Sequence, residues 1–200
     1  MQATEGASCR RAGRPRDART DVAVLQAVLD LAAEHGLAHL SMDAVAARAG
    51  VAKATIYRRW PSKEALIIES WRCLIAPVET PDTGTLRGDI ELMLSTLLDN
   101  LDGRGFDMLA QVAAAARSDE ALASALQEFL AARRQPMRAV LQRYIDRGVL
   151  AADLDVDLVA DTIVGPLLYR LMLSRSVVDA AVLRSVIDIV LGGVERLPEP

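Results

Sequence analysis

From residue 17 onwards, apolar positions recur at intervals of three and four residues, which is the spacing of amphipathic helices. In the first segment, Leu25, Val28, Leu29 and Ala32 follow this spacing, and Gly36 stands where a left-handed residue would end the helix. No segment alternates with a period of two, so we expect no sheet. The pattern predicts an all-α fold.

Two short helices are predicted next, over residues 41–49 and 53–60, and only three residues join them. Ser41 is placed to cap the first helix, and Gly50 supplies a sharp turn at its end. So short a connection makes the two helices cross steeply, as in a helix-turn-helix.

The second of these short helices has an apolar and a polar face. Ile56 and Trp60, four residues apart, are predicted to anchor it in the core. The outward positions carry polar and cationic side chains, namely Lys53, Thr55, Tyr57, Arg58 and Arg59. A cationic helix of this width fits the major groove of DNA.

Further helices are predicted along the rest of the chain. Ser62 is placed to cap a fourth helix. Pro136 removes a hydrogen bond within a later helix, so we expect a kink or break near Gln135, and Gly165-Pro166 should distort the next helix. The periodic segments after residue 85 run over about 86–101, 106–117, 119–147, 155–175 and 179–191.

Composition indicates a globular protein of a reducing compartment. Apolar residues make up 52% of the 200 residues, which is enough for a sizeable core, and no apolar run is long enough to cross a membrane. The Arg-rich N-terminus has no apolar stretch of the kind found in secretory signals. With only Cys9 and Cys73 present, we expect no structural disulfide. A cytoplasmic location is therefore predicted, with no membrane partner.

Charge is distributed unevenly along the chain. Residues 1–63 carry 10 Lys and Arg against 6 Asp and Glu, whereas residues 64–200 carry 13 against 21. A basic first part on an acidic remainder indicates that only the first part meets a polyanion.

Residues 1–16 are polar and rich in arginine, so we predict a disordered basic arm. Within it, Gly13-Arg14-Pro15-Arg16 is open to two interpretations. A rigid proline between arginines resembles an AT-hook core, which lies in a narrow minor groove. Alternatively, the segment is a solvated basic tail that adds only nonspecific attraction to DNA.

Residues 40–67, LSMDAVAARAGVAKATIYRRWPSKEALI, resemble the N-terminal head of the TetR family of bacterial repressors. The resemblance covers about residues 17–70 and is carried by GV-x-K-x-T-x-Y, a large aromatic residue and PSKEAL. The rest of the chain resembles the family in length and helical texture. The predicted domains are the arm (1–16), a helix-turn-helix DNA-binding domain (17–61) and a helical regulatory and dimerisation domain (62–200).

The resemblance implies a role in DNA binding for matching residues. Lys53 and Thr55 would approach the DNA at the start of the recognition helix, and Tyr57 would place its hydroxyl on a phosphate. Helix N-termini attract anions, which supports phosphate contacts near Ser41 and Lys63. The predicted DNA-binding residues are Ser41, Met42, Lys53, Ala54, Thr55, Tyr57, Arg58, Arg59 and Lys63, with Arg14 and Arg16 from the arm.

The head departs from the family pattern at four positions. Ala52 stands where a capping Ser is frequent, and Ala54 where Gly is frequent. Arg59 and Trp60 stand where His and Phe are common. The missing cap costs about 1 kcal/mol at the recognition helix, but no group that the mechanism needs is lost.

The resemblance also implies an effector pocket and a dimer interface in the later helices. Large apolar side chains are predicted to line the pocket, and ordinary core packing is the other interpretation of the same residues. These residues are Trp71, Met93, Phe106, Met108, Met137, Tyr144 and Tyr169. The last two apolar stripes either pack within one subunit or form a four-helix interface between two copies. We favour the interface, to which we assign Leu167, Leu168, Leu171, Leu183, Val186, Ile187 and Val190.

The predicted function is sequence-specific binding of double-stranded DNA by a homodimer. Repression is the usual mode of the family, so we predict a repressor that an unknown small-molecule effector releases from a near-palindromic operator. The alternative is a ligand-independent DNA-binding protein controlled by a protein partner. We find no nucleophilic triad, phosphate loop or metal-ligand spacing, so we predict no enzyme activity, cofactor or metal. The Asp residues between 153 and 161 are interpreted as helix-capping.

Overall fold

A computed structural model describes residues 15–75, 79–100, 103–174 and 176–194. Within these ranges the regular elements are helices and none is a strand, as the periodicity predicted. Two compact units are formed, one from residues 1–76 and 101–129 and the other from residues 77–100 and 130–200. In the same described ranges, no helix combines the length and apolar character needed to cross a bilayer.

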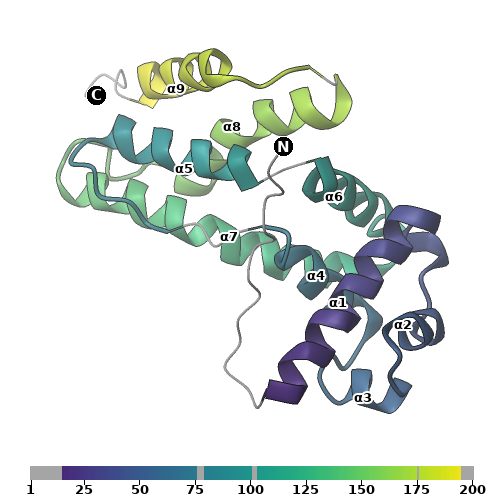
Figure 1. Cartoon of the computed structure of the whole chain (residues 1–200). Helices are drawn as coiled ribbons and strands as arrows, with labels where there is room; N and C mark the ends of the chain where they lie inside the picture. Colours follow the sequence, from purple (N-terminus) through teal and green to yellow (C-terminus); the bar gives the residue numbers. More distant parts are fainter. Residues whose placement is uncertain (1–14, 76–78, 101–102, 175, 195–200) are drawn as a thin grey trace, which may run out of the picture. The chain divides into compact units, whose positions relative to one another are not determined.

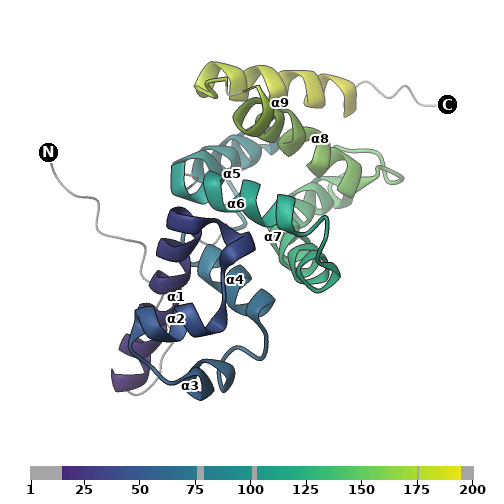
Figure 2. The ribbon, with the colours of Figure 1, turned by 90° about the vertical axis from the view of Figure 1, so that its right-hand side faces the viewer.

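The first unit contains the helix-turn-helix. Its elements are α1 (Pro15–His35), the short 3₁₀ helix η1 (Leu37–His39), α2 (Met42–Ala49), α3 (Lys53–Tyr57), α4 (Lys63–Arg72), α6 (Gly103–Ala115) and the first part of α7 (Glu120–Asp146). Helix α1 packs against α2 and α4, and α2 contacts α3 (Figures 1 and 2). Each of these helices contributes fully buried residues to the core, among them Val24, Val45, Ile56 and Leu66.

The second unit is built from the later helices. Its elements are α5 (Leu86–Asn100), the rest of α7, α8 (Val156–Leu168), the wider helical turn η2 (Tyr169–Leu173) and α9 (Ala180–Val194). Helix α9 packs against both α5 and α8. Ile90, Leu94, Leu141, Ile163 and Ile187 are almost completely buried in one apolar cluster.

A buried carboxylate ties α5 to α7 in this second unit. Asp89 has no exposed surface, and its Oδ1 accepts hydrogen bonds from the backbone N–H of Thr83 at 2.6 Å and from the Thr83 hydroxyl at 2.7 Å. Its Oδ2 accepts from the Tyr144 hydroxyl at 3.0 Å and from Arg143 Nη1 at 3.4 Å. The buried charge is therefore fully supplied with donors, which is the condition for burying it.

Local chemistry ends several helices where the sequence predicted. Gly36, Gly50 and Gly148 all have positive φ, at 77°, 67° and 72°, a conformation that glycine adopts without steric cost. Asp155 caps α8 by accepting from the backbone N–H of Leu158 at 3.0 Å. The capping role expected of the aspartates in this segment is confirmed for Asp155, whereas Asp161 bonds Arg134 instead.

The recognition helix is shorter than predicted. Helix α3 ends at Tyr57 instead of Trp60, although the Trp60 N–H still bonds to the Ile56 carbonyl at 2.9 Å. Pro61 has no N–H and prevents continuation. Ile56 is fully buried as predicted. Trp60 is only partly buried, so it anchors the helix in the core less fully than predicted.

The two prolines within helices behave differently. Helix α7 runs through Pro136 as one element, so of the predicted kink or break near Gln135 the break does not occur, and the kink stays a prediction; the other hydrogen bonds of its 27 residues outweigh the one that proline removes. Helix α8 includes Pro166 and then widens into η2, where the Ser174 N–H bonds to the carbonyl of Tyr169, five residues back, at 3.1 Å. The distortion predicted for that helix is confirmed.

Candidate nucleic-acid interface

The turn between α2 and α3 is fixed by its own backbone and one side chain. Ser41 Oγ accepts from the backbone N–H of Ala44 at 3.1 Å and so caps α2. At the other end, the Val51 N–H bonds to the Ala46 carbonyl at 3.0 Å, across the left-handed Gly50. These bonds set the direction in which the chain enters α3.

Helix α3 exposes the face that was predicted to meet DNA. Lys53, Ala54, Tyr57 and Arg58 are exposed, and Thr55 is partly exposed. Tyr57 keeps 44% of its surface accessible, so its aromatic ring does not belong to the core. Ala52 precedes the helix without a side-chain cap, so the cap that the family usually has is absent here.

Cations around α3 fall into two groups. Lys53 Nζ lies 2.9 Å from Asp43 Oδ2, and Arg59 pairs with Asp21 of α1. The hydrogen bond with Asp43 raises the pKa of Lys53 above its ordinary value. Arg58 and Lys63 have no ion-pair partner within the described part of the chain. Part of the positive charge of this face is therefore neutralised internally.

Lys63 and Met42, each predicted to contact DNA from the first residue of a helix, differ in exposure. Ser62 Oγ caps α4 by accepting from the Ala65 N–H at 3.1 Å, which places Lys63 in the first turn. Met42, which was included among the DNA-binding residues, is only 6% exposed and packs in the core of the head. Its side chain is thus unavailable to DNA.

The basic arm falls largely outside the described residues. Arg14 belongs to the undescribed N-terminal segment. Pro15 and Arg16, which were assigned to the arm, are the first residues of α1. Proline is favoured in a first helical turn because that turn has no partner for its N–H. The two interpretations of Gly13-Arg14-Pro15-Arg16 both stay predictions.

The residues predicted to line an effector pocket are divided between the two units. Trp71, Phe106 and Met108 belong to the first unit, whereas Met93, Met137, Tyr144 and Tyr169 belong to the second. Met93, Met137 and Tyr144 are buried in the apolar cluster of the second unit, as the core interpretation held. Tyr169 is instead 60% exposed.

Trp71 stands out among them. It is 2% exposed, and its ring centroid lies 4.6 Å from that of Phe129. Its indole Nε1–H has no hydrogen-bond acceptor in the described structure. A buried donor without an acceptor costs about 1–3 kcal/mol, so this group would gain from an acceptor atom reaching it.

Helix α6 is linked to the end of α1. Gln111 Oε1 accepts from the backbone N–H of Leu37 in η1 at 3.0 Å. Beside this bond lies a hollow of about 300 Å³, lined by Leu29 of α1, Met108 of α6 and Leu74, among others. Gln111 was not predicted from the sequence, because nothing in its local sequence marks a contact 74 residues away.

The stripes assigned to a dimer interface are mostly internal. Leu167, Leu183, Val186, Ile187 and Val190 are at most 8% exposed and belong to the core cluster of the second unit, while Leu168 and Leu171 are partly buried. The burial of these five residues within one chain favours the other interpretation, packing within one subunit, because periodicity shows that a face is apolar but does not show what covers it.

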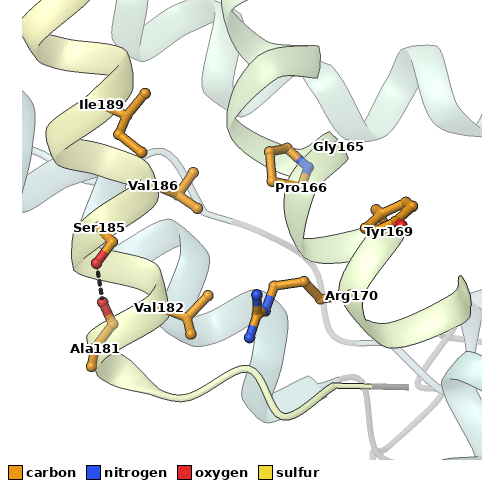
Figure 3. Close-up of a pocket in the computed structure, with 9 residues that line it drawn as sticks. All are labelled: Gly165, Pro166, Tyr169, Arg170, Ala181, Val182, Ser185, Val186 and Ile189. Atoms are coloured by element: carbon orange, nitrogen blue, oxygen red, sulfur yellow. Dashed lines mark hydrogen bonds between the residues drawn. The ribbon is translucent and has the colours of Figure 1, made fainter. Parts of the chain in front are cut away.

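Other apolar residues in these helices and in the segment between η2 and α9 are exposed. Ile189, Leu173, Val177 and Tyr169 are all at least 60% exposed. A hollow of about 590 Å³ lies between the end of α8 with η2 and helix α9. Figure 3 shows residues that line it, among them Pro166, Tyr169 and Ile189. Arg170 also lines this hollow, and its Nε is buried without a hydrogen-bond partner in the described structure. This outer apolar face was not predicted from the sequence.

Two family models match the chain. Residues 24–69 match the model for bacterial regulatory proteins of the tetR family, and residues 80–190 match a tetracyclin repressor-like C-terminal domain. An uncharacterized HTH-type transcriptional regulator of Bacillus subtilis, YdeS, is 34% identical over 92% of this chain and 93% of that protein.

Solved structures show the same fold. The TetR family transcription regulator SCO0332 superposes with a TM-score of 0.70 at 30% identity, over 88% of this chain and 98% of that one. FadR from Bacillus subtilis, solved in complex with stearoyl-CoA, gives a TM-score of 0.67 at 20% identity, over 86% of this chain and 98% of that one. The head and the later helices are thus similar to the same group of proteins.

Proposed function

Because this chain belongs to the TetR family of bacterial helix-turn-helix transcriptional regulators, we propose that it acts in the cytoplasm as a homodimeric repressor of a near-palindromic operator, released by a small-molecule effector. The observation that carries the proposal is the exposed, cationic face of α3, held on the buried Ile56. The family is one of transcriptional regulators and is not an enzyme class.

In the proposed complex, α3 lies in the major groove. Thr55 and Tyr57 sit on its exposed side, where they reach base edges and phosphates, and Arg58 is a cation without an internal partner in the described structure. The start of α4 brings Lys63 to a backbone phosphate. Phosphate contacts then fix the register of the head, and the contacts from α3 read the sequence.

A dimer explains how so short a recognition helix selects a useful site. Two heads related by a two-fold axis would enter successive major grooves, about 34–36 Å apart. The exposed apolar residues of α8, η2 and α9 supply a self-complementary surface for that axis. Residues such as Ile189 and Leu173, rather than the internal stripe, would form the contact.

The effector would act by stabilising a conformer whose heads are spaced wrongly for DNA. Such release requires that the effector bind the two conformers with different affinities, and coupling of about 1–3 kcal/mol is typical. The unpaired indole N–H of Trp71 is a donor that a polar atom of the effector would satisfy. Gln111 and its bond to η1 provide a contact between α6 and the head through which the change would be felt.

The decisive test is selection of bound DNA from a random duplex library at about physiological salt, where loose phosphate-only binding is weakened. We expect enrichment of a near-palindrome by the wild-type protein. The Thr55→Val and Tyr57→Phe variants should lose the enrichment, whereas Thr162→Val, an exposed control on α8, should keep it.

Either of two results would refute the proposal: no enrichment by a folded wild-type protein, or the same sequence selected by all three variants. With an operator in hand, a compound library can be screened for release of the DNA. Failure of every compound would favour the alternative of control by a protein partner.

A further inference from the structure

One acidic side chain lies within the cationic face of the head. Asp43, in the first turn of α2, accepts a hydrogen bond from the ammonium of Lys53, the first residue of α3, with 2.9 Å between Nζ and Oδ2. Both side chains are open to solvent, with 78% of Asp43 and 44% of Lys53 exposed. Exposed ion pairs of this kind add little to folding stability, because solvent screens them and both side chains lose freedom.

The position of the pair matters more than its strength. Lys53 is one of the four cations around the recognition helix, and in the free head its charge is already matched by a carboxylate. A DNA phosphate that approaches Lys53 must displace Asp43 and also approach a negative charge. Binding to DNA then releases fewer counterions than the number of cations implies, and counterion release is the main source of nonspecific affinity.

Resting on the proposed DNA-binding function, we propose that Asp43 is a built-in competitor of DNA phosphate at Lys53, which weakens the binding of nonspecific duplexes. Its carboxylate takes the place of the phosphate in the free protein. Any genome offers a large excess of nonspecific sites that compete for a regulator. If a regulator of modest charge binds those sites less tightly, more of it stays free to bind its operator.

The head offers a matched control for the charge change. Glu34 at the end of α1 holds Arg48 of α2 through two bonds, of 2.9 and 2.6 Å. Asp43→Asn and Glu34→Gln each remove one negative charge, and each deprives one cation of its carboxylate partner. Only the first frees a cation at the start of α3.

The test measures binding of the full chain to a short random-sequence duplex by fluorescence anisotropy over a series of salt concentrations. For Asp43→Asn we expect tighter binding and a plot of log K against log salt that is steeper by about 0.9 for each head engaged. The ratio of its binding constant to that of the wild-type protein should then fall about threefold per head between 50 and 200 mM salt. Glu34→Gln should leave the slope unchanged.

A second substitution attributes the gain to Lys53. Lys53→Gln should weaken binding in the wild-type background, because it leaves the carboxylate of Asp43 unmatched, and in the Asp43→Asn background it should abolish the gain in both affinity and slope. Circular dichroism confirms that each variant is folded before binding is measured.

Two outcomes would overturn the inference. Equal effects of Asp43→Asn and Glu34→Gln would mean a general effect of net charge. Weaker binding by Asp43→Asn would mean that Asp43 positions Lys53 for DNA instead of competing with it. Neither outcome depends on an operator, so the inference can fail while the proposed function stands; if no variant, Asp43→Asn included, binds the random duplex even at low salt, the inference is refuted and the proposed function is left to the selection experiment.

Discussion

Replacing Asp89 by asparagine should destabilise the second unit strongly, although the two side chains have the same shape. The Asp89 carboxylate is fully buried and accepts four hydrogen bonds, two from Thr83, one from Tyr144 and one from Arg143. In the variant, the remaining oxygen still accepts hydrogen bonds from Thr83. The new NH₂ group is itself a donor, and it faces the donors of Tyr144 and Arg143. Two bonds to a charged acceptor are lost, so we expect a loss of about 3 kcal/mol in the free energy of unfolding.

Urea denaturation followed by circular dichroism measures this loss, at one fixed protein concentration because a dimer's stability depends on it. Asp161→Asn is the matched control, since Asp161 also bonds an arginine, Arg134 at 2.9 Å, but is 55% exposed. That variant should lose less than about 1 kcal/mol. Equal losses in the two variants would refute the argument that burial makes the Asp89 network matter.

The dependence on pH gives the same argument a second test. Burial raises the pKa of Asp89, but hydrogen bonds from Thr83 and Tyr144 and the charge of Arg143 outweigh it and hold the pKa below its ordinary value. A carboxylate whose pKa is depressed on folding stabilises the protein above its unfolded pKa, about 3.9. That stability is lost as pH falls through the folded value. The difference between wild type and Asp89→Asn should therefore narrow below about pH 4; a constant difference would contradict the assignment.

Three further predictions concern the head and the outer apolar face. Ala52→Ser should give α3 the cap it lacks and stabilise the protein by about 1 kcal/mol in urea denaturation, whereas Ala47→Ser, at an exposed position within α2, should give no gain. Gly50→Ala should cost about 1 kcal/mol, because φ is 67° although the space around it is open, while Gly192→Ala within α9 should stabilise slightly; equal effects would contradict the role of the left-handed turn. Ile189→Lys should convert a dimer to monomers in size-exclusion chromatography, and Val22→Lys, at an exposed residue of α1, should not; a dimer that survives Ile189→Lys would place the interface elsewhere.

The elements of the head could be predicted from the sequence because local chemistry determines their ends. Ser41 caps α2 through an atom three residues away, and Gly50 takes the left-handed conformation that few other residues tolerate. The exposed face of α3 follows from the same short range, once Ile56 is placed in the core.

The interactions that the sequence did not reveal are long-range. Asp89 meets Tyr144 across 55 residues, and Gln111 meets Leu37 across 74. Likewise, the apolar stripe of α9 predicted a buried face correctly, but only the packing of α9 on α5 and α8 shows that this face is internal and that Ile189 lies on the other side. A period of 3.6 residues fixes which residues share a face and leaves the partner of that face open.

The charges of the chain favour a regulator whose affinity for DNA depends more on the spacing of its heads than on electrostatic attraction to phosphates. The first 63 residues exceed neutrality by only a few positive charges, the remainder is acidic, and Asp43 and Asp21 match two of the four cations around α3. A single head of this kind should hold DNA weakly, because phosphate attraction scales with the number of free cations. In the proposed dimer, two heads on a two-fold axis would recover affinity only where both half-sites lie at the right spacing, since the second contact would then be intramolecular. Weak heads would therefore make the affinity of that dimer sensitive to their spacing, which is the quantity that the proposed effector would change.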